Sequence, residues 1–374
     1  MNLVASSPEG LEGFLAEEIR ELGGSEVKIA KRFVSFSCDY RTFYRLHFFS
    51  RIAFRFYREV ARFPCSDKYS LYEGVKLSFN WLKWLPIDKS FCVHVTGSNS
   101  YLRHSHFTSL QVKNAIIDLQ KSAFGKRSNI SLDNPDLVIH LHLNNEEGIL
   151  SLQSTNVSLH KRGYRPAIGN APLKENVAAG LLRITRWDGQ KPLVDIMCGS
   201  GTFLIEGISK VFNIPSFLDN NYLFQNWIDF DKNIFLSEKL QLKKNFLIQK
   251  KIAKVLGCDS NDDVLNQAKN NIKLAGFEDY IEVYNMDFSN LKIYDHEGIV
   301  VCNPPYGKKL GNESNLINLY SRMGEVLKEN FSGWEFWLLS GNASLTKYLK
   351  MKSSQKIPVS NGGIDCRWIK YLIR

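Results

Sequence analysis

The chain has 374 residues, a formal net charge of +10 and a hydrophobic fraction of 44%. That length allows two or more domains with cores of their own, and the composition is typical of a soluble globular protein. The sequence has no stretch near the roughly 20 apolar residues of a membrane span and no apolar run of signal-peptide length at its start, which predicts a cytoplasmic protein without a membrane partner. The positive charge favours a polyanionic partner, although many proteins are basic without one.

The metal-ligating residue types show no clustering along the chain. The seven cysteines, at positions 38, 65, 92, 198, 258, 302 and 366, form no CxxC pair. Histidines at 104, 106 and 140 have no carboxylate or cysteine at ligand spacing. We therefore expect free thiols in a reducing compartment and no metal site.

The first 158 residues alternate between helical and extended patterns. A helix is predicted over 8–24, a strand over 26–38 and a longer helix over 41–62. Arginines at 51, 55, 58 and 62 share one face of that last helix, which could contact phosphates but is more often simply solvated. Further elements are predicted over 79–85 (helix), 90–96 (strand), 109–123 (helix), 137–143 and 148–154 (strands). This order favours an α+β module over a nucleotide-binding one.

Residues 156–171 have the composition of a connection between domains. They contain His160-Lys161-Arg162-Gly163-Tyr164-Arg165, in which basic side chains surround an aromatic ring. Such a segment could guide a nucleic-acid strand, or could be an ordinary exposed connection.

From residue 172 onward, strands and helices alternate regularly. The predicted strands are 192–197, 254–259, 281–287, 298–301, 334–340, 355–359 and 366–373, and the predicted helices are 172–187, 202–212, 262–275 and 314–330. This pattern predicts an α/β domain with a doubly wound, mostly parallel sheet. Residues 213–253 form an insertion, aromatic at first and then lysine-rich, with a helix expected in its second half.

A ligand site is predicted where three of these strands end. After Val194 the chain makes a glycine turn through Gly199 and Gly201, which lets backbone approach a ligand closely and opens a helix with free N–H groups. The next two strands end in Asp259, suited to the hydroxyls of a ribose, and Asp287, suited to an adenine amino group. The three tips together predict a nucleoside pocket that holds no phosphate. The alternative is that both acids are helix N-caps.

The short apolar strand before residue 303 leads into Asn303-Pro304-Pro305-Tyr306. The prolines hold the chain stiff and extended, so an amide, a backbone carbonyl and an aromatic ring are presented at one strand tip. An exocyclic amino group of a base needs such acceptors and a ring to stack on. The alternative is an ordinary strand-ending turn.

These residues resemble a known family. The segments DIMCGSGTFLIE (195–206) and CNPPYG (302–307) are similar to those of bacterial ribosomal RNA guanine-N2 methyltransferases, in particular the N-terminal half of the bifunctional large-subunit enzyme. The resemblance covers essentially the whole chain, with two departures. Ile196 stands where the family usually has proline, and the chain ends at Arg374 without room for a second methyltransferase, so a single activity is expected.

The resemblance implies three domains: ferredoxin-like (1–65), THUMP (66–158) and class I methyltransferase with a seven-stranded sheet (159–374). It implies S-adenosylmethionine as cofactor and RNA, from the large ribosomal subunit or its assembly intermediate, as partner. The implied cofactor residues are Asp195, Met197, Cys198, Gly199, Gly201, Thr202, Asp259, Ser260 and Asp287. The implied catalytic residues are Asn303, Pro304, Pro305 and Tyr306, and the candidate RNA contacts are Arg103, Lys113, Lys161, Arg162 and Arg165.

Three other functions stay open on the sequence. The same Asn-Pro-Pro-Tyr turn serves adenine-N6 methyltransferases of DNA or RNA, and a tRNA guanine is a close alternative to a ribosomal one. From a different class, the chain could be an RNA-binding or ribosome-assembly protein that has kept a methyltransferase fold without catalysis.

Overall fold

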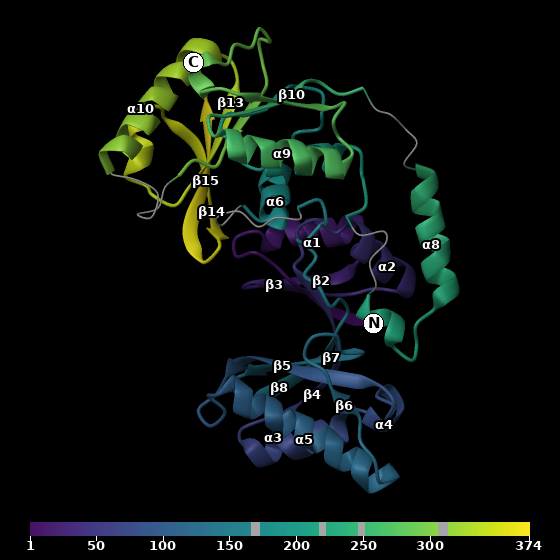
Figure 1. Cartoon of the computed structure of the whole chain (residues 1–374). Coiled ribbons are helices and arrows are strands. Elements are labelled where there is room, and N and C mark those ends of the chain that lie inside the picture. The colour runs from purple at the N-terminus through teal and green to yellow at the C-terminus, as the bar shows by residue number, and fades with distance from the viewer. Residues whose placement is uncertain (166–172, 217–221, 246–250, 306–312) are drawn as a thin grey trace.

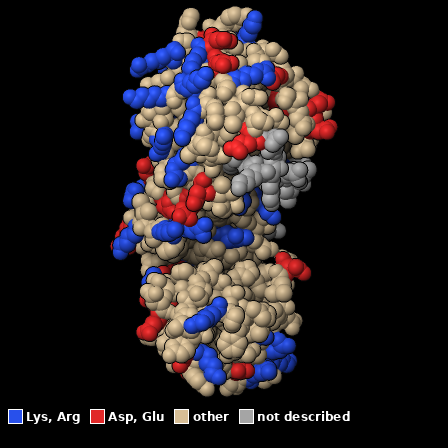
Figure 2. Space-filling view, turned by 90° about the vertical axis from the view of Figure 1, so that its left-hand side faces the viewer, with Lys and Arg blue, Asp and Glu red and all other residues tan. Residues whose placement is uncertain are grey.

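The computed structural model describes residues 1–165, 173–216, 222–245, 251–305 and 313–374. The molecule is elongated, with one lobe set apart from the rest by a narrower waist (Figures 1 and 2). Its strands form two sheets, one of eight strands in the first 153 residues and one of seven strands in the last 182.

The eight-stranded sheet joins the two predicted front domains. Its strand order is β2-β3-β1-β4-β8-β7-β5-β6, antiparallel except where β5 pairs with β7 and β6. The strands are β1 (Asn2–Ser6), β2 (Ser25–Ala30), β3 (Phe33–Ser37), β4 (Arg55–Pro64), β5 (Ser90–Ser98), β6 (Asn129–Ile130), β7 (Leu137–Asn144) and β8 (Glu147–Gln153). The accompanying helices are α1 (Glu12–Glu21), α2 (Tyr40–Phe49), α3 (Lys68–Ser78), α4 (Trp81–Trp84) and α5 (Ser105–Phe124). The expected boundary at residues 65 and 66 follows β4, in the middle of this sheet.

The predicted helix over 41–62 is wrong beyond residue 49. The chain leaves α2 at Ser50 in an extended conformation (φ −61°, ψ 126°) and re-enters the sheet as β4. Apolar residues at 52, 56 and 60 fit both the period of a helix and the period of a strand. The pairing of this segment with β1 on one side and β8 on the other stabilises the strand. The arginines at 51, 55, 58 and 62 therefore share no helix face.

The predicted strand over 26–38 is in fact a hairpin of β2 and β3. The chain turns at Arg32, whose φ of 68° is left-handed. The sequence offers no glycine at this turn, which is why the break was not predicted. Strand β1 and helix α3 were also not predicted.

The seven-stranded sheet has the order β11-β10-β9-β12-β13-β15-β14, parallel except that β15 runs against both neighbours. The strands are β9 (Leu193–Asp195), β10 (Val255–Asp259), β11 (Ile281–Asn285), β12 (Ile299–Cys302), β13 (Glu335–Ser340), β14 (Ser353–Asn361) and β15 (Ile364–Leu372). The helices are α6 (Glu175–Thr185), α7 (Thr202–Val211), α8 (Lys232–Asn245), α9 (Asp262–Ala275) and α10 (Glu313–Asn330), with 3-10 turns η1 (Leu223–Asn226), η2 (Phe288–Asn290) and η3 (Leu345–Leu349). The predicted doubly wound, mostly parallel sheet of seven strands is confirmed.

This sheet is buried on both faces. Along β12, Val301 belongs to one apolar core together with residues of α7, and Val300 belongs to a second core together with residues of α10. Strand order reverses at β9, which lies between β10 and β12. In such sheets the crevice for a ligand lies at the carboxyl ends of the strands beside this reversal.

The insertion reaches back to the front of the molecule. Helix α8, the helix expected in its second half, lies beside α2 (Figure 1), and Arg45 forms an ion pair of 2.6 Å with the buried Glu238 of α8. Trp227 packs near Phe43 of α2 and Phe224. The insertion thus fastens the methyltransferase-like unit to the first helices of the chain.

Candidate active site

Three strand tips predicted to share a ligand are joined by hydrogen bonds. Gly199 N donates to Asp259 Oδ2 (3.0 Å), and Cys198 N donates to the Cys258 carbonyl (2.9 Å). Met286 N donates to the Asp259 carbonyl (3.2 Å). The loops after β9, β10 and β11 are therefore one continuous structure.

The glycine turn has the geometry expected of it. Gly199 and Gly201 have φ of 54° and 78°, and a Cβ placed on Gly199 would have open space around it. Gly201 is the N-cap of α7 and supplies no side chain to the first N–H groups of this helix. Thr202, a predicted cofactor residue, is buried, and its hydroxyl accepts a hydrogen bond from the Arg165 guanidinium. This contact ties the start of α7 to the connecting segment.

Asp195 ends β9 and is 2% exposed. Its pKa is raised to about 8, chiefly by burial and also by the nearby Asp259 charge, while the hydrogen bond from Met197 N opposes both. Burial therefore favours the protonated, neutral form of this acid near neutral pH. Burial also raises the pKa of the Cys198 thiol, so this side chain is a neutral part of the wall.

The two acids at the next strand tips differ. Asp259 caps no helix; α9 is capped by Asn261, and Asp259 binds Gly199 N and Asn261 N. Asp287 is the N-cap of η2, as the alternative interpretation expected, and accepts from Ser289 N (2.9 Å). It also accepts two hydrogen bonds from Arg322 of α10 (2.8 and 3.1 Å). Ser260, between these loops, is exposed.

Asn303 and Pro304 follow β12, next to β9 in the sheet. Pro304 is buried and Pro305 half-buried. The Asn303 Oδ1 atom is buried, and none of the residues that the structure describes donates a hydrogen bond to it. Leaving a buried amide oxygen unpaired costs about 1 to 3 kcal/mol, so such an atom calls for a missing partner. Tyr306 lies outside the described residues.

The candidate RNA contacts divide into two groups. Arg103 and Lys161 are exposed and Lys113 is half-buried. Arg162 and Arg165, in contrast, have side chains only 4% and 9% exposed, and they pair with Glu206 (3.4 Å) and Glu175 (3.4 Å). These two arginines tie the connecting segment to α7 and α6, so the expectation that they touch RNA is corrected: their guanidinium groups do not reach the surface.

Two polar residues of this region were not predicted. Glu206 of α7 is 1% exposed and meets both Arg162 and Arg51, and Arg322 orients Asp287. Both contacts join segments far apart in the chain, so no local pattern of residues marks them. Within the described ranges, no three His, Cys, Asp or Glu side chains gather as metal ligands would, and none of the helices there has the length and apolar character to cross a membrane.

Comparison with known proteins agrees with this geometry. Residues 162–370 match the family described as the RMKL-like methyltransferase domain, residues 66–153 match the THUMP domain, and residues 2–57 match the RlmL ferredoxin-like domain. The predicted combination of a class I methyltransferase fold with ferredoxin-like and THUMP domains is confirmed.

Individual relatives cover the chain from end to end. A provisionally named RNA methyltransferase of Synechocystis sp. is 39% identical over 98% of this chain and 95% of its own length. The ribosomal RNA large subunit methyltransferase K/L of Aliivibrio fischeri is 36% identical over 99% of this chain, which spans about half (53%) of that relative. The solved structure of the methyltransferase SMU.472 with S-adenosylhomocysteine has a TM-score of 0.89 at 25% identity, covering 100% of this chain and 98% of that one. On its sequence and its fold, this chain belongs to the RMKL-like methyltransferase family.

Proposed function

We propose that the chain transfers a methyl group from S-adenosylmethionine to the exocyclic N2 amine of a guanine in large-subunit ribosomal RNA. The observation that carries the proposal is the buried Asn303 Oδ1, to which none of the described residues donates a hydrogen bond, at the strand tip beside the glycine turn. Family membership supports methyl transfer, and the names of the relatives support RNA as the substrate.

The strand tips fit the cofactor. Gly199 has open space for the methionine part, and the buried Asp195 can receive its ammonium group. Asp259 would bind the ribose hydroxyls through the lone pairs that its two backbone donors leave free. Asp287 would accept from the adenine amine through Oδ2, which accepts from Arg322 Nη1 and keeps a further lone pair. The cofactor, when bound, supplies the activated methyl group.

The chain positions the acceptor amine. In the proposed arrangement Asn303 Oδ1 and the Pro304 carbonyl accept hydrogen bonds from the two N–H groups of the guanine amine. These hydrogen bonds turn the lone pair of the amine toward the methyl group. Stacking of Tyr306 on the base stays a prediction. Catalysis by these residues is positioning in a pocket that excludes water, and requires neither a metal nor a covalent intermediate.

The front of the molecule would hold the RNA. Its THUMP match supports this role, and the net charge of +10 of the whole chain favours a polyanionic partner. We propose the domain division at residues 65/66 and 158/159; the matched ranges support it, with the qualification that the first two domains share one sheet. A paired guanine would have to be flipped out of its helix to reach Asn303.

The test is methyl transfer to RNA from a strain that lacks the gene. Purified protein is incubated with labelled S-adenosylmethionine and total RNA or ribosomal particles, and the RNA is separated by size and digested to nucleosides. We expect label in N2-methylguanosine of large-subunit ribosomal RNA. Label in tRNA would change the substrate and keep the chemistry, and label in N6-methyladenosine would overturn the guanine assignment.

A second measurement separates an enzyme from a binding protein. Asp259→Ala should weaken cofactor binding by about tenfold or more while RNA binding is kept, because in the proposed arrangement this carboxylate meets the cofactor and not the RNA. Absence of label in every RNA fraction and particle, with cofactor binding intact in the wild-type protein, would favour the non-catalytic RNA-binding alternative.

A further inference from the structure

Two cavities flank the segment that connects the front sheet to the methyltransferase unit. They measure about 650 and about 590 Å³, and both are lined by Asn156, Val157 and Lys161. They are therefore two parts of one recess, which we call the linker recess. It lies apart from Asn303 and Asp259, neither of which lines it.

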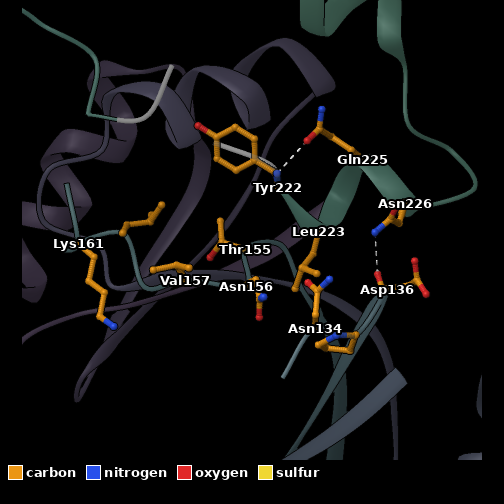
Figure 3. A pocket seen from close by; sticks show the side chains of 12 residues that line it. Asn134, Asp136, Thr155, Asn156, Val157, Lys161, Tyr222, Leu223, Gln225 and Asn226 are labelled. Carbon is orange, nitrogen blue, oxygen red and sulfur yellow. Dashed lines mark hydrogen bonds between the residues drawn. The ribbon is translucent and has the colours of Figure 1, made fainter. Parts of the chain in front are cut away.

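The first cavity is lined by polar groups from three segments. Figure 3 shows the side chains of the 12 residues that line it, which come from the segments 134–136, 155–161 and 222–226. Gln225 and Asn226 are engaged with neighbouring backbone, and the Asp136 carboxylate is held by Ser90 and Lys89. Among the described residues, none forms a hydrogen bond with the side-chain amides of Asn134 and Asn156, so these amides can contact a ligand.

A buried hydroxyl in this wall also lacks a partner. Thr155 is 4% exposed, and no described residue hydrogen-bonds its Oγ1 atom. A hydroxyl both donates and accepts, so together with the two amides it can match the edge of a base. A volume of about 650 Å³ is that of a small-molecule site and can hold a nucleotide.

The second cavity is cationic. Arg55, Lys161 and Lys174 line it, and its one carboxylate, Asp133, is exposed. Within the described ranges Lys161 and Lys174 form no ion pair, and Arg55 Nε is buried without a hydrogen-bond acceptor. Lys174 is held in place because its ammonium group lies over the Phe54 ring at 5.2 Å.

The pKa of His160, which also lines the second cavity, reflects the positive charge around it. Its pKa is lowered to about 4, first by burial and then by the charges of Lys174, Arg162, Lys161 and Arg55. Four cations therefore act on one imidazole. A cavity of this kind attracts an anion.

We propose that the linker recess binds an unpaired strand of RNA, with a phosphodiester in the cationic cavity and the neighbouring base in the amide-lined cavity. The inference deepens the proposed function, since it assumes that RNA is the substrate and adds where an unpaired part of it is held. Phosphate contacts supply the affinity, and the amides and the Thr155 hydroxyl supply contacts to the base.

The first experiment measures binding of a fluorescein-labelled oligouridine of about a dozen nucleotides to the full chain by anisotropy at several salt concentrations. The variant Lys161→Ala/Lys174→Ala should bind about tenfold more weakly, and its log–log salt slope should fall by about 0.7 for each phosphate that is no longer neutralised. The matched control is Lys269→Ala/Lys273→Ala, which removes two exposed lysines of α9 outside the recess and should bind like the wild type. Equal affinity of both variants would overturn the proposal.

The second experiment tests the base. Wild-type protein should bind oligouridine several-fold more tightly than an abasic strand of the same length, and Asn134→Ala/Asn156→Ala should lose this preference with its salt slope unchanged. A preference that survives in the variant would overturn the role of the first cavity. An oligoglutamate peptide that displaces oligouridine at equal charge concentration would assign the recess to an acidic protein partner instead.

These outcomes are independent of methyl transfer. If the wild type methylates RNA but the lysine variant binds oligouridine normally, the inference fails and the proposed function stands. If no substrate RNA is methylated while oligouridine binding depends on Lys161 and Lys174, the recess stands and the proposed function fails.

Discussion

The two sheets of this protein are buried in different ways. Strands β9 and β12 are buried at every residue, whereas β1 and β3 alternate between buried and partly exposed residues. A sheet buried on both faces can present functional groups only at its strand ends, and that is where the glycine turn, the acids and Asn303 lie. A sheet with one open face can also present functional groups on that face and where distant segments of the chain meet. The linker recess lies at such a meeting of distant segments.

The two units are joined through a buried charge cluster. Glu206 of α7 contacts Arg51 of the front unit at 3.5 Å and Arg162 of the connecting segment at 3.4 Å, and Tyr164 donates to it at 3.2 Å. Helix α7 begins at the glycine turn, so the front unit is anchored one helix away from the cofactor pocket. If the units divide their roles in this way, substitutions at the junction should change stability, and substitutions at the strand tips should change chemistry.

The largest effect is expected from breaking the junction. Glu206→Ala should lower the free energy of unfolding by about 3 to 5 kcal/mol, because it leaves Arg51 and Arg162 buried without their shared carboxylate. Urea unfolding measures the change. The control is Glu297→Ala, which breaks an exposed pair with Lys191 and should leave the free energy of unfolding nearly unchanged. Equal losses for both variants would mean that the cluster does not hold the units together.

The next effect concerns the methyltransferase unit alone. Asn303→Ala should lower kcat by about a hundredfold and leave cofactor affinity unchanged, since the amide is proposed to touch only the acceptor base. Single-turnover methyl transfer and calorimetric cofactor titration measure the two quantities. Asn290→Ala, an exposed amide after β11, serves as the control. Unchanged methyl transfer in Asn303→Ala would rule out the proposed role.

The same contrast explains what could be predicted from the sequence. In the methyltransferase unit each strand and its loop are local signals. A buried strand is a short apolar run, and each functional residue lies at or just after the end of one: Gly199 after β9, Asp259 at the end of β10 and Asn303 after β12. In the front unit a one-sided strand such as β4 has the same apolar spacing as an amphipathic helix over a few residues, and only its pairing with β1 and β8 resolves the ambiguity.

The burial of the arginines in the connecting segment could not be predicted for a related reason. Lys161, Arg162 and Arg165 are equivalent in a sequence rich in basic residues, yet Lys161 is exposed while the two arginines meet Glu206 and Glu175. Their partners lie 10 to 44 positions away along the chain, and no local spacing marks them. Their positive charge predicted an RNA contact for all three residues. The structure distinguishes the exposed lysine from the two buried arginines.

A smaller effect should appear as a dependence on pH. Burial holds the pKa of Asp195 at about 8 in the folded protein, against an ordinary value near 3.8, so between these values the folded state keeps a proton that the unfolded state has lost. Stability from this group is complete below about pH 4 and is lost as pH rises toward 8, by at most about 1.4 kcal/mol per pH unit. The free energy of unfolding of Asp195→Asn should not show this fall with rising pH, because asparagine does not titrate.

Urea unfolding of wild type and Asp195→Asn at pH 5, 6 and 7 checks the sign. The variant should gain stability relative to the wild type at each step upward, within the slope allowed for one proton. Parallel curves would show that Asp195 is ionised in the folded protein, and the ammonium group of the cofactor would then meet a preformed carboxylate.

The smallest effect separates orientation of the cofactor from catalysis. Burial alone would raise the pKa of Asp287, but hydrogen bonds from Ser289 and the charge of Arg322 hold it below its ordinary range. Arg322 is half exposed, so the pair contributes little to stability; its proposed role is to fix one carboxylate orientation for the adenine amine. Arg322→Ala should therefore raise the KM for S-adenosylmethionine by several-fold, with kcat and the unfolding midpoint unchanged.

The KM of Arg322→Lys, which keeps the charge without the paired hydrogen bonds, should lie between those of the wild type and Arg322→Ala. Lys328→Ala on the same helix should leave the KM unchanged. A fall in kcat at saturating cofactor would instead connect α10 to the acceptor base, and orientation of the adenine would then be too narrow a description of this arginine.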